Sequence, residues 1–545
     1  MTTASPPVAT GARRAPARWT TPIGAALSAY LARRARFLSA TSSRAHDARA
    51  TQLHQLRALM RLAANTEVGR AANFTRALNR SDADLVRAYR DAIQPGDYEV
   101  WRARYRRMRE LAQPDVTWPG VVTDWAQTSG TTGGEKYIPV SRHMMRSNYR
   151  AALDIFAHAK RFGVSLPQMF GGRLLFLGGS TDVSINDRGI RTGDLSGLVT
   201  GLIKWPLSQV YTPGPEVALL SHWPTKIEAM AKVTLPQDIR FISGMASWSL
   251  VLFQRVLELA RQRDPSITCL RDVWPHLNLF VHGGVRYQPF DARVREAWSG
   301  TTHTDIPHRL EVYPASEGFI AVQDTPNDPG LRLHTDHQIF FEFIPVEEIN
   351  APSPRAFMCD EVEKGQRYVV VMTTCAGMWR YIIGDVVEFD TVPPEGPPRL
   401  RIVGRHKHFI NAFGENLIVE EIERAVVATQ QSLNIRTGEF TAAPVYPAPG
   451  RAAGLELVVE WKPNAPDQLA HFARTFDTAL RSINVDYNTK RTGDLGMGAP
   501  TITPVPMGAF HKWMEHTGKL GGQHKCPRCA NTRDFVEGVI AANSE

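Results

Sequence analysis

The sequence predicts an α/β protein in two parts, a large N-terminal domain with mixed sheets and helices and a small, mobile C-terminal α+β domain. Three observations lead to this prediction. The chain has 545 residues, which is too long for one ordinary domain. In its middle third, short apolar runs that end in glycines alternate with helical stretches, as expected of layered strands and helices. Near residues 404–407 the pattern changes from a strand to a Gly-Arg turn and then to an amphipathic helix, which indicates a boundary.

We therefore expect a disordered basic tail over residues 1–22, the large domain over 23–406 and a C-terminal lid domain over 407–545. Apolar spacings of three and four predict helices from about 23 to 112, interrupted at 95–101. In the large domain, the strands expected after these helices are at 173–179, 239–248 (running into a turn), 276–285, 308–322 (with a turn inside), 339–348 and 367–374. The further helices are expected at 217–233 and from the turn after 239–248 to about 262. In the lid, we expect strands at 454–461 and 499–506 around a helix at 466–484.

Composition and charge exclude two classes of protein. Of the net charge of +9, residues 1–60 carry +8, so the main body is nearly neutral and offers no basic face for nucleic acid. No apolar run approaches the roughly 20 residues of a membrane helix. The five cysteines are few and odd in number, which favours a reducing, cytoplasmic compartment over a disulfide framework. The Arg/Ala-rich start also resembles an organelle transit peptide, and a disordered tail followed by a surface helix is the alternative.

The stretch TSGTTGGEK at residues 128–136 has the composition of a phosphate-binding loop. Glycines let backbone N–H groups converge on an anion, while Ser129, Thr131 and Thr132 add hydroxyl groups and Lys136 adds a positive charge. It is not a Walker A loop, because no Gly-Lys-Ser/Thr sequence is present. The alternative interpretation is a flexible surface loop.

Two acids stand at places where strands and turns meet. Glu317 lies in YPASEG (313–318), where a carboxylate is a suitable ligand for Mg²⁺ bridged to phosphates. Asp385 lies between a glycine and an apolar strand in MWRYIIGDVVEF (378–389), where it can accept hydrogen bonds from ribose hydroxyls. A solvated turn glutamate and a turn-capping aspartate are the alternatives. The basic segment 518–528 is either a nucleotide contact or a solvated loop, and the scattered histidines form no recognisable metal-binding spacing.

Taken in order, these stretches resemble the motifs of the adenylate-forming superfamily of acyl-CoA synthetases, adenylation domains and luciferases. A closer resemblance is to the Gretchen Hagen (auxin-responsive promoter) family of acyl-acid amido synthetases. It is carried by NTEVGR, KYIPVS, HGGV, FFEFIP, TTCAGMWRYIIGDVV and HKCPR, which extend over nearly the whole chain after residue 50.

The resemblance implies an AMP-forming ligase that makes carbon–nitrogen bonds. A carboxylic acid would react with ATP to give an acyl-adenylate and pyrophosphate, and an amine or amino acid would then displace AMP to give an amide. ATP and Mg²⁺ are the implied cofactors. The implied partners are a small-molecule acid and an amine or amino acid, with no nucleic acid and no membrane.

The resemblance also implies roles for individual residues. The catalytic residues would be Lys136, Glu317 (also the Mg²⁺ ligand) and Lys525 of the lid, with Lys407 at the hinge. The nucleotide would contact Ser129, Gly130, Thr131, Thr132, Gly133, Gly284, Val285, Tyr313, Ser316, Asp385 and Arg405. The substrate pocket would include Met245, Trp248 and His282, and a core role for Met245 and Trp248 is equally compatible with the sequence.

Two departures from the family pattern leave alternatives open. Glu135 replaces the usual proline of the phosphate loop, and Ile382 replaces the usual arginine of the ribose motif, for which Arg380 or Arg405 would substitute. The alternatives are an acyl-CoA or carrier-protein ligase that shares the first step, and a nucleotide-binding protein without catalysis. A basic nucleic-acid binder is disfavoured by the charge distribution. The acid and the amine are not readable from the sequence, whose composition resembles that of a high-GC bacterium with a specialised metabolism.

Overall fold

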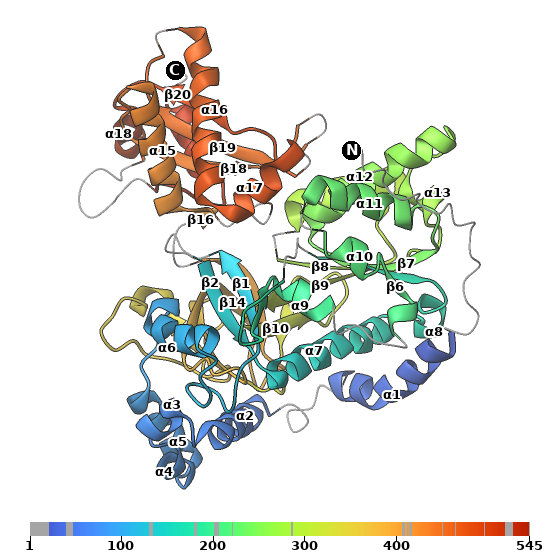
Figure 1. Ribbon diagram of the computed structural model, residues 1–545, viewed down its shortest axis with the longest axis vertical. Helices are drawn as coiled ribbons and strands as arrows, with labels where there is room; N and C mark the ends of the chain where they lie inside the picture. Colours follow the sequence, from blue (N-terminus) through green and yellow to red (C-terminus); the bar gives the residue numbers. More distant parts are fainter. Residues whose placement is uncertain are drawn as a thin grey trace.

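The structure is a computed structural model (Figure 1). It describes residues 21–39, 47–129, 135–178, 183–200, 207–220, 222–284, 287–405, 409–410, 413, 417–448, 451–463, 465–494, 496–517 and 527–543. The C-terminal elements, coloured orange to red, form a separate body above the rest of the molecule in this view.

The centre of the larger part is an 11-stranded sheet with the order β12-β13-β14-β15-β11-β10-β9-β8-β7-β3-β6. In the half of the sheet from β9 to β6, neighbouring strands pair in parallel. Helices connect the successive strands of this half along the chain, as parallel crossovers require. The elements of this half are β3 (Arg173–Leu177), β6 (Tyr211–Thr212), α10 (Pro215–Ala218), α11 (Trp223–Thr234), β7 (Ile239–Gly244), α12 (Ala246–Arg263), α13 (Leu270–Val273), β8 (Leu279–Gly283), α14 (Asp291–Ser299) and β9 (His308–Ala315).

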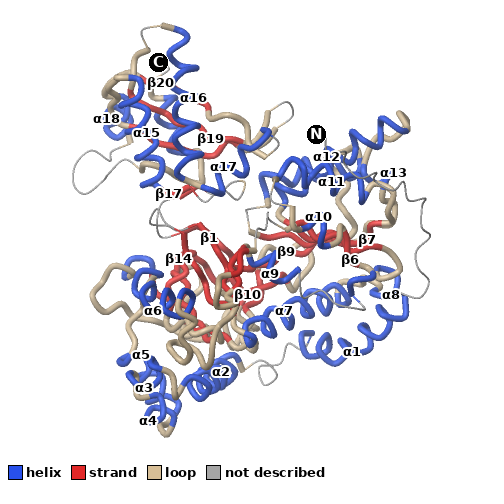
Figure 2. Tube along the Cα trace, in the orientation of Figure 1, coloured by secondary structure: helices blue, strands red, loops and turns tan. Residues whose placement is uncertain are grey.

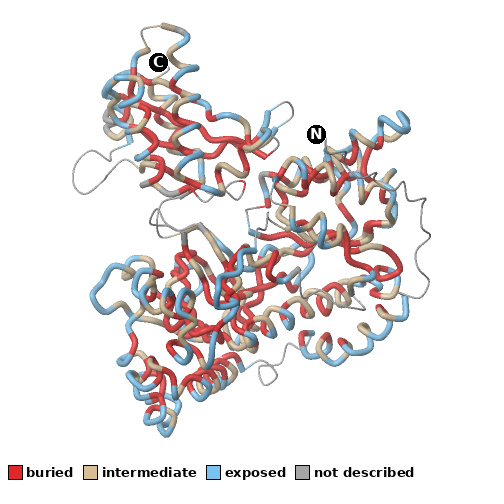
Figure 3. The backbone as a smooth tube through the Cα atoms, in the orientation of Figure 1, coloured by how far each residue is buried: buried red, intermediate tan, exposed pale blue. Residues whose placement is uncertain are grey.

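The other half of the sheet is antiparallel and is built largely from β-branched and aromatic residues, which favour strands. Every residue of β12 is buried, so this half forms a core layer (Figure 3). Its strands are β10 (Gly318–Gln323), β11 (Leu331–Leu333), β12 (Ile339–Pro345), β13 (Arg367–Thr374), β14 (Tyr381–Thr391) and β15 (Arg399–Arg405).

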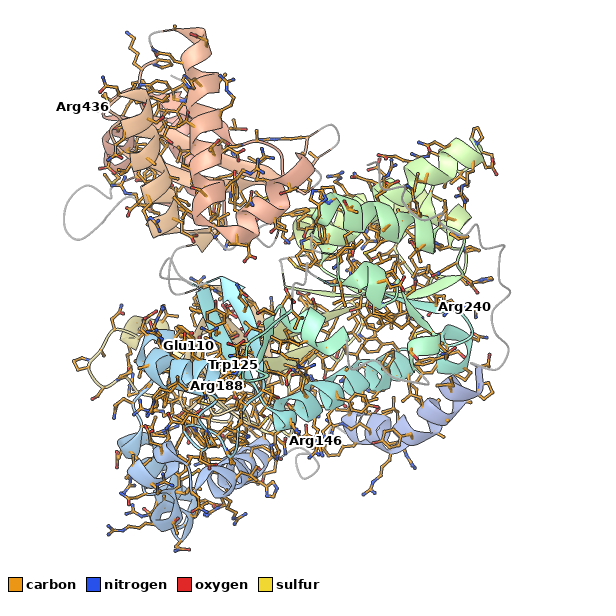
Figure 4. The ribbon with its side chains drawn as sticks, viewed as in Figure 1. Glu110, Trp125, Arg146, Arg188, Arg240 and Arg436 are labelled. Atoms are coloured by element: carbon orange, nitrogen blue, oxygen red, sulfur yellow. The ribbon has the colours of Figure 1, made fainter. Side chains whose placement is uncertain are left out.

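A smaller sheet of four strands, β2-β1-β5-β4, and a set of helices surround this core. Trp125 of β1, labelled in Figure 4, is fully buried. The elements are α1 (Thr21–Ser39), α2 (Ala48–Ala63), α3 (Glu67–Ala71), α4 (Phe74–Leu78), α5 (Asp82–Ala92), α6 (Tyr98–Glu110), β1 (Asp124–Ser129), β2 (Glu135–Val140), α7 (Arg142–Arg161), α8 (Leu166–Met169), β4 (Ser184–Ile185), β5 (Arg191–Gly193) and α9 (Leu195–Thr200). Short 3₁₀ turns lie at Leu207–Gln209, Gln288–Phe290 and Val346–Glu348.

The C-terminal body is a three-stranded sheet with helices against it (Figure 2). A two-stranded hairpin precedes this sheet in the chain. The elements are β16 (Phe409–Ile410), β17 (Leu417–Ile418), α15 (Val419–Leu433), β18 (Phe440–Val445), β19 (Gly454–Glu460), α16 (Pro466–Ile483), α17 (Val485–Arg491), a 3₁₀ turn (Thr492–Asp494), β20 (Thr501–Val505), α18 (Ala509–His516) and α19 (Asp534–Ala541). None of the helices described is long and apolar enough to cross a membrane.

Two expected helix boundaries were wrong. The expected interruption at 95–101 is shorter, because α6 already begins at Tyr98, where Asp97 accepts the N–H of Glu99 as a helix cap. The expected helix at 217–233 is divided into α10 and α11. Pro224 lies in the first turn of α11, where its missing N–H is tolerated, so a new helix starts there instead of the old one continuing.

Candidate active site

The carboxyl ends of three parallel strands meet at one edge of the large sheet. β7 ends at Gly244, β8 at Gly283 and β9 at Ala315, and ligands of open α/β sheets bind at such edges. Gly284, just after β8, has φ +83°, a conformation that favours glycine. A Cβ built at Gly284 would lie 3.3 Å from Cγ of Met245, so the ends of β7 and β8 are in close contact.

The end of β9 forms a tight hairpin with β10 that presents Glu317. Ala315 pairs with Gly318, which leaves Ser316 and Glu317 as the two residues of the turn. Both are partly buried. Burial raises the pKa of the Glu317 carboxyl above its usual value, and the positive charges of Lys136 and Arg405 partly oppose this shift. The glutamate is therefore a carboxylate held among cations at the edge of the sheet.

Asp385 reaches the same place through a bulge in β14. Val371 pairs with Ile382 and Val369 pairs with Val386, so two steps along β13 correspond to four along β14. Gly384, inside this bulge, has φ +95°, which a residue with a Cβ rarely adopts. The extra residues displace Asp385 from regular pairing with β13 and re-aim its side chain.

Both oxygens of the Asp385 carboxylate accept hydrogen bonds from other strands. Oη of Tyr313 on β9 donates to Oδ2 at 2.5 Å, and Nε of Arg405 on β15 donates to Oδ1 at 2.5 Å. Arg405 is also the pairing partner of Asp385 across β14 and β15. The carboxylate is fixed in orientation, and its remaining lone pairs are able to accept hydroxyl donors from a ligand.

Lys136 approaches this cluster from the second sheet. It pairs with Thr128 across β1 and β2, and it is largely buried. Its Nζ lies 6.0 Å from the centre of the Tyr98 ring, within range of a weak cation–π interaction. The positive charge of Lys136 also lowers the pKa of Glu317.

Three tyrosines of the site were not predicted. Tyr98 and Tyr105 lie seven residues apart on the buried face of α6, and Tyr381 begins β14. The negative charge of Glu317 contributes to the raised pKa values of Tyr105 and Tyr381, whose main cause is burial. Oη of Tyr105 is buried without a hydrogen-bond partner among the described residues. The helical spacing of Tyr98, Trp101 and Tyr105 was the available signal, but residues 95–101 were interpreted as an interruption between helices.

Arg380 does not substitute for the arginine that is missing at Ile382. Its Nε donates to Oε2 of Glu342 at 2.9 Å, and its Nη1 donates to the carbonyl oxygen of Ile93 at 2.8 Å. Both side chains of this ion pair are buried, so Arg380 holds α5 against β12 instead of facing the site. Arg405 is the arginine that contacts Asp385.

Two residues assigned to the substrate pocket lie in other surroundings. His282 is buried within β8, its ring stacks on Tyr287 at 4.1 Å, and neither ring nitrogen has a hydrogen-bond partner among the described residues. Burial holds its pKa well below the usual value. Trp248 donates its indole N–H to the carbonyl oxygen of Phe413 at 3.1 Å, which places it against the C-terminal body.

Seven of the predicted site residues lie outside the part of the chain that the structure describes, so their roles stay predictions. They are Gly130, Thr131, Thr132, Gly133, Val285, Lys407 and Lys525. For Ser129 the structure describes only the backbone, at the end of β1.

The donor set suits a nucleotide with a divalent cation. Glu317 supplies a hard carboxylate oxygen of the kind that Mg²⁺ prefers, and Lys136 and Arg405 bring positive charge for phosphates. The unpartnered hydroxyl of Tyr105 and the free lone pairs of Asp385 offer further polar contacts. The residues present therefore fit both ATP and Mg²⁺.

The architecture is that of the acyl acid amido synthetases. The solved structure of GH3.15 acyl acid amido synthetase covers 91% of this chain and 94% of its own, with a TM-score of 0.56 at 17% identity. The same enzyme in complex with 2,4-DB covers 96% of each chain with the same TM-score. At this identity the likeness shows the fold alone.

The chain belongs to the GH3 family. It matches the GH3 family N-terminal domain over residues 37–213, the central domain over 332–405 and the C-terminal domain over 420–534, which together make about two thirds of its length. These stretches contain Lys136, Asp385 and Arg405, and the resemblance inferred from the sequence motifs is confirmed.

Curated plant proteins are also relatives of this chain in sequence. Indole-3-acetic acid-amido synthetase GH3.3 of Arabidopsis thaliana is 26% identical over 280 residues, which are 49% of this chain and 45% of the relative. Jasmonoyl--L-amino acid synthetase JAR4 of Nicotiana attenuata is 28% identical over 255 residues, which are 44% of this chain and 42% of the relative. The chain thus spans about half the length of the curated relatives that it matches.

Proposed function

We propose that this protein is an ATP-dependent acyl acid amido synthetase. It would join a carboxylic acid to ATP as an acyl-adenylate with release of pyrophosphate, and then transfer the acyl group to an amine or amino acid with release of AMP. The observation that carries the proposal is the gathering of Glu317, Asp385, Lys136 and Arg405 from three separate parts of the chain at one edge of the sheet. Membership of the GH3 family and the names of the relatives support it.

The chemistry explains why such a cluster is needed. A carboxylate does not react with an amine, because its leaving group would be oxide. When a carboxylate oxygen forms a bond to the α-phosphorus, the bond to the bridging oxygen breaks and the electron pair leaves with pyrophosphate. The acyl carbon then carries AMP, a weakly basic leaving group. The site must bring two anions together and stabilise the charge on the transferring phosphoryl group.

Each residue of the cluster has a role in this proposal. Lys136, with the loop 129–134, neutralises the β- and γ-phosphates. Glu317 would hold Mg²⁺, which when bound neutralises phosphate charge. Asp385 accepts the ribose hydroxyls in the orientation that Tyr313 and Arg405 fix. Gly284 leaves room for the adenine ring beside Met245, and Ser316 adds a polar contact from the turn. His282 is buried within β8, so no general base for the amine is assigned.

The C-terminal body is proposed to act as a lid over this site. Lys525 would approach the nucleotide in one of two closed arrangements, and rotation at Lys407 would exchange them. In this arrangement the body meets the larger part at Trp248. The indole N–H of Trp248 donates to the Phe413 carbonyl oxygen, and its ring lies 3.8 Å from Nζ of Lys490.

We place the substrates among small-molecule acids and amino acids. The relatives are named for indole-3-acetic acid and jasmonoyl conjugation, and a specialised-metabolite acid of a bacterium is an equal candidate. A cytoplasmic location fits the cysteines, since the thiols of Cys269, Cys359 and Cys375 are free and buried.

Product analysis tests the proposal directly. The protein is mixed with ATP, Mg²⁺, a panel of aryl and alkyl acids and pooled amino acids, and the products are identified by mass. AMP, pyrophosphate and a new amide mass are expected. Pyrophosphate exchange without an amide would point to an acyl-CoA or carrier-protein ligase. ADP as the product would refute adenylation, and no turnover with any acid would favour a protein that only binds nucleotide.

A further inference from the structure

A second cluster of ligand-type side chains lies inside the protein, at the contact between α7 and the segment that joins β11 to β12. Asp154 of α7, His334 and His337 place one potential ligand atom each within 4.8 Å of one another, and all three residues are buried. None of them belongs to the cluster around Glu317. We propose that these residues form a structural site for a divalent transition-metal ion, with Zn²⁺ as the ion that fits best.

The two separations from Asp154 match tetrahedral coordination. Nε2 of His337 lies 3.3 Å and Nδ1 of His334 lies 3.6 Å from Oδ2 of Asp154. Zinc binds nitrogen and oxygen ligands at about 2.0–2.2 Å, which separates neighbouring ligands of a tetrahedron by about 3.3–3.6 Å. Both observed separations fall in this interval and are longer than a good hydrogen bond. Two imidazoles and one carboxylate are a common zinc ligand set.

An unsatisfied atom of His337 points to the same conclusion. Nε2 of His337, the atom near Asp154, is buried without a hydrogen-bond partner among the described residues. Nδ1 of His337 is 2.8 Å from Oδ1 of Asp336, to which it donates. This bond leaves the lone pair on Nε2, facing Asp154, and a carboxylate behind a ligating histidine is the usual support of a metal site. A bound ion would give this buried nitrogen a partner.

The charges and the backbone around the cluster are also suitable. Arg34 of α1 donates to both Asp154 and Asp336. When a bound ion holds both imidazoles in the neutral form, the two carboxylates and this arginine leave the group with one negative charge. The segment carrying the histidines is fixed on both sides. Ser147 Oγ donates to the carbonyl oxygen of His337, and Nε2 of Gln52 donates to that of Thr335 at 2.7 Å. The ligands are therefore held in place before an ion binds.

Metal analysis of the full-length protein tests the proposal. The protein is loaded with Zn²⁺, dialysed and measured by elemental analysis, and Co²⁺ is substituted to record its visible absorption. We expect about one Zn²⁺ per chain, the intense d–d bands of tetrahedral cobalt, and a rise in Tm with metal that a chelator reverses. Absence of bound Zn²⁺ and Co²⁺ from the folded protein would overturn the proposal.

Variants assign the ligands. Asp154→Asn and His334→Gln are expected to lose the stoichiometric ion, and Asp336→Asn to weaken it by about 10–100-fold. His158→Gln is the matched control, since His158 is also buried with an unpartnered Nε2 but lies outside the ligand group. Circular dichroism confirms that each variant is folded. Unchanged metal content in both folded ligand variants, or loss of the ion in the control alone, would refute the assignment.

Discussion

At the scale of single residues, the site combines an acid whose burial opposes its charge with cations that favour the charged form. Burial raises the pKa of Glu317, while Lys136 and Arg405 favour its ionised form. Such a carboxylate contributes little to stability at neutral pH, because the folded state holds its proton more tightly than the unfolded chain does. Its place in the turn agrees with the proposed function.

The first prediction concerns Glu317→Gln. We expect adenylation to fall by about 10²–10³-fold, since a group that stabilises developing charge is lost, while Tm at pH 7 stays equal or rises. Pyrophosphate exchange and thermal denaturation measure the two effects. Glu216→Gln, a change at an exposed glutamate, is the control. Near-normal exchange in the Glu317 variant would remove this residue from the site.

The second prediction concerns the pH dependence of stability. Burial raises the pKa of Glu311 to about 7 from its usual 4.5, with Arg309 partly opposing the shift. The folded state thus binds the Glu311 proton more tightly than the unfolded chain does. The protonated form therefore stabilises the fold fully below about pH 4.5, and this contribution to the free energy of unfolding is lost as the pH rises through 7. Glu311→Gln should remove up to about 3 kcal/mol of this decline between pH 5 and pH 8. Urea denaturation at both pH values, with wild type in parallel, checks it, and an unchanged slope would contradict it.

At the scale of elements, irregular features of strands position the functional groups. The two-residue turn between β9 and β10 holds Glu317 at the edge of the sheet, and the bulge in β14 turns Asp385 toward Tyr313 and Arg405. The hairpin of β1 and β2 carries Lys136 to the same edge. Regular pairing at any of these points would leave the side chain on the wrong face, because neighbouring residues of a strand alternate between faces.

The third prediction tests the bulge. Gly384→Ala places a Cβ on a residue with φ +95°, which should cost about 1–3 kcal/mol of stability and displace Asp385. We expect adenylation to fall further than the loss of folded protein explains. Gly404→Ala is the control, since a Cβ there would meet no atom within 4 Å. Equal activity per folded molecule in both variants would show that the bulge does not position the carboxylate.

The fourth prediction concerns the contact that joins α12 to α17. Nζ of Lys490 lies 3.8 Å from the centre of the Trp248 ring and 5.1 Å from that of Trp223. A double-mutant cycle of Trp248→Leu and Lys490→Met should give a coupling free energy of about 0.5–2 kcal/mol, because a cation over an aromatic face is stabilised when it is shielded from water. Unfolding in denaturant measures it. Additive effects within about 0.3 kcal/mol would show that the ring and the ammonium do not interact.

At the scale of the whole molecule, one apolar core crosses from the larger part into the C-terminal body. The cluster that contains Leu175, Trp274 and Phe280 continues through Phe413 to Leu457 and Phe476. The separate cores around Trp379 and around Phe170 belong to the larger part alone. The bodies are thus in apolar contact in this arrangement, and a rotation at the proposed hinge would have to break part of that contact.

The fifth prediction separates the two half-reactions. Lys407→Pro would restrict the backbone at the proposed hinge, because proline fixes φ near −65°. We expect pyrophosphate exchange to be kept within about threefold, while amide formation falls by about tenfold or more, since only the second step needs the other arrangement of the lid. Lys462→Pro, outside the hinge, is the control. Equal losses in both assays would argue against a domain rotation at this residue.

Much of the fold and part of the site were predictable from the sequence alone. Strands that end in glycines, and the order of the motifs, were enough to predict the α/β class, most of the strands and the family, because glycine turns and apolar runs are local properties of the chain. The same motifs identified Lys136, Glu317 and Asp385. The division at residues 406–407 stays a prediction, since residues 406–408 lie outside the described part.

Only the tertiary structure decided which side chains meet. The charge of Glu317 acts on Tyr105 of α6 and Tyr381 of β14, Arg380 forms an ion pair with Glu342, and Trp248 contacts the C-terminal body. Asp154 and His334 are 180 residues apart in sequence and so show no metal-binding spacing. The physical reason is common to all of these cases. Pairing across the sheets brings distant segments together. Neither the hydrophobic period nor the spacing of residues along the sequence predicts which side chains will then be neighbours.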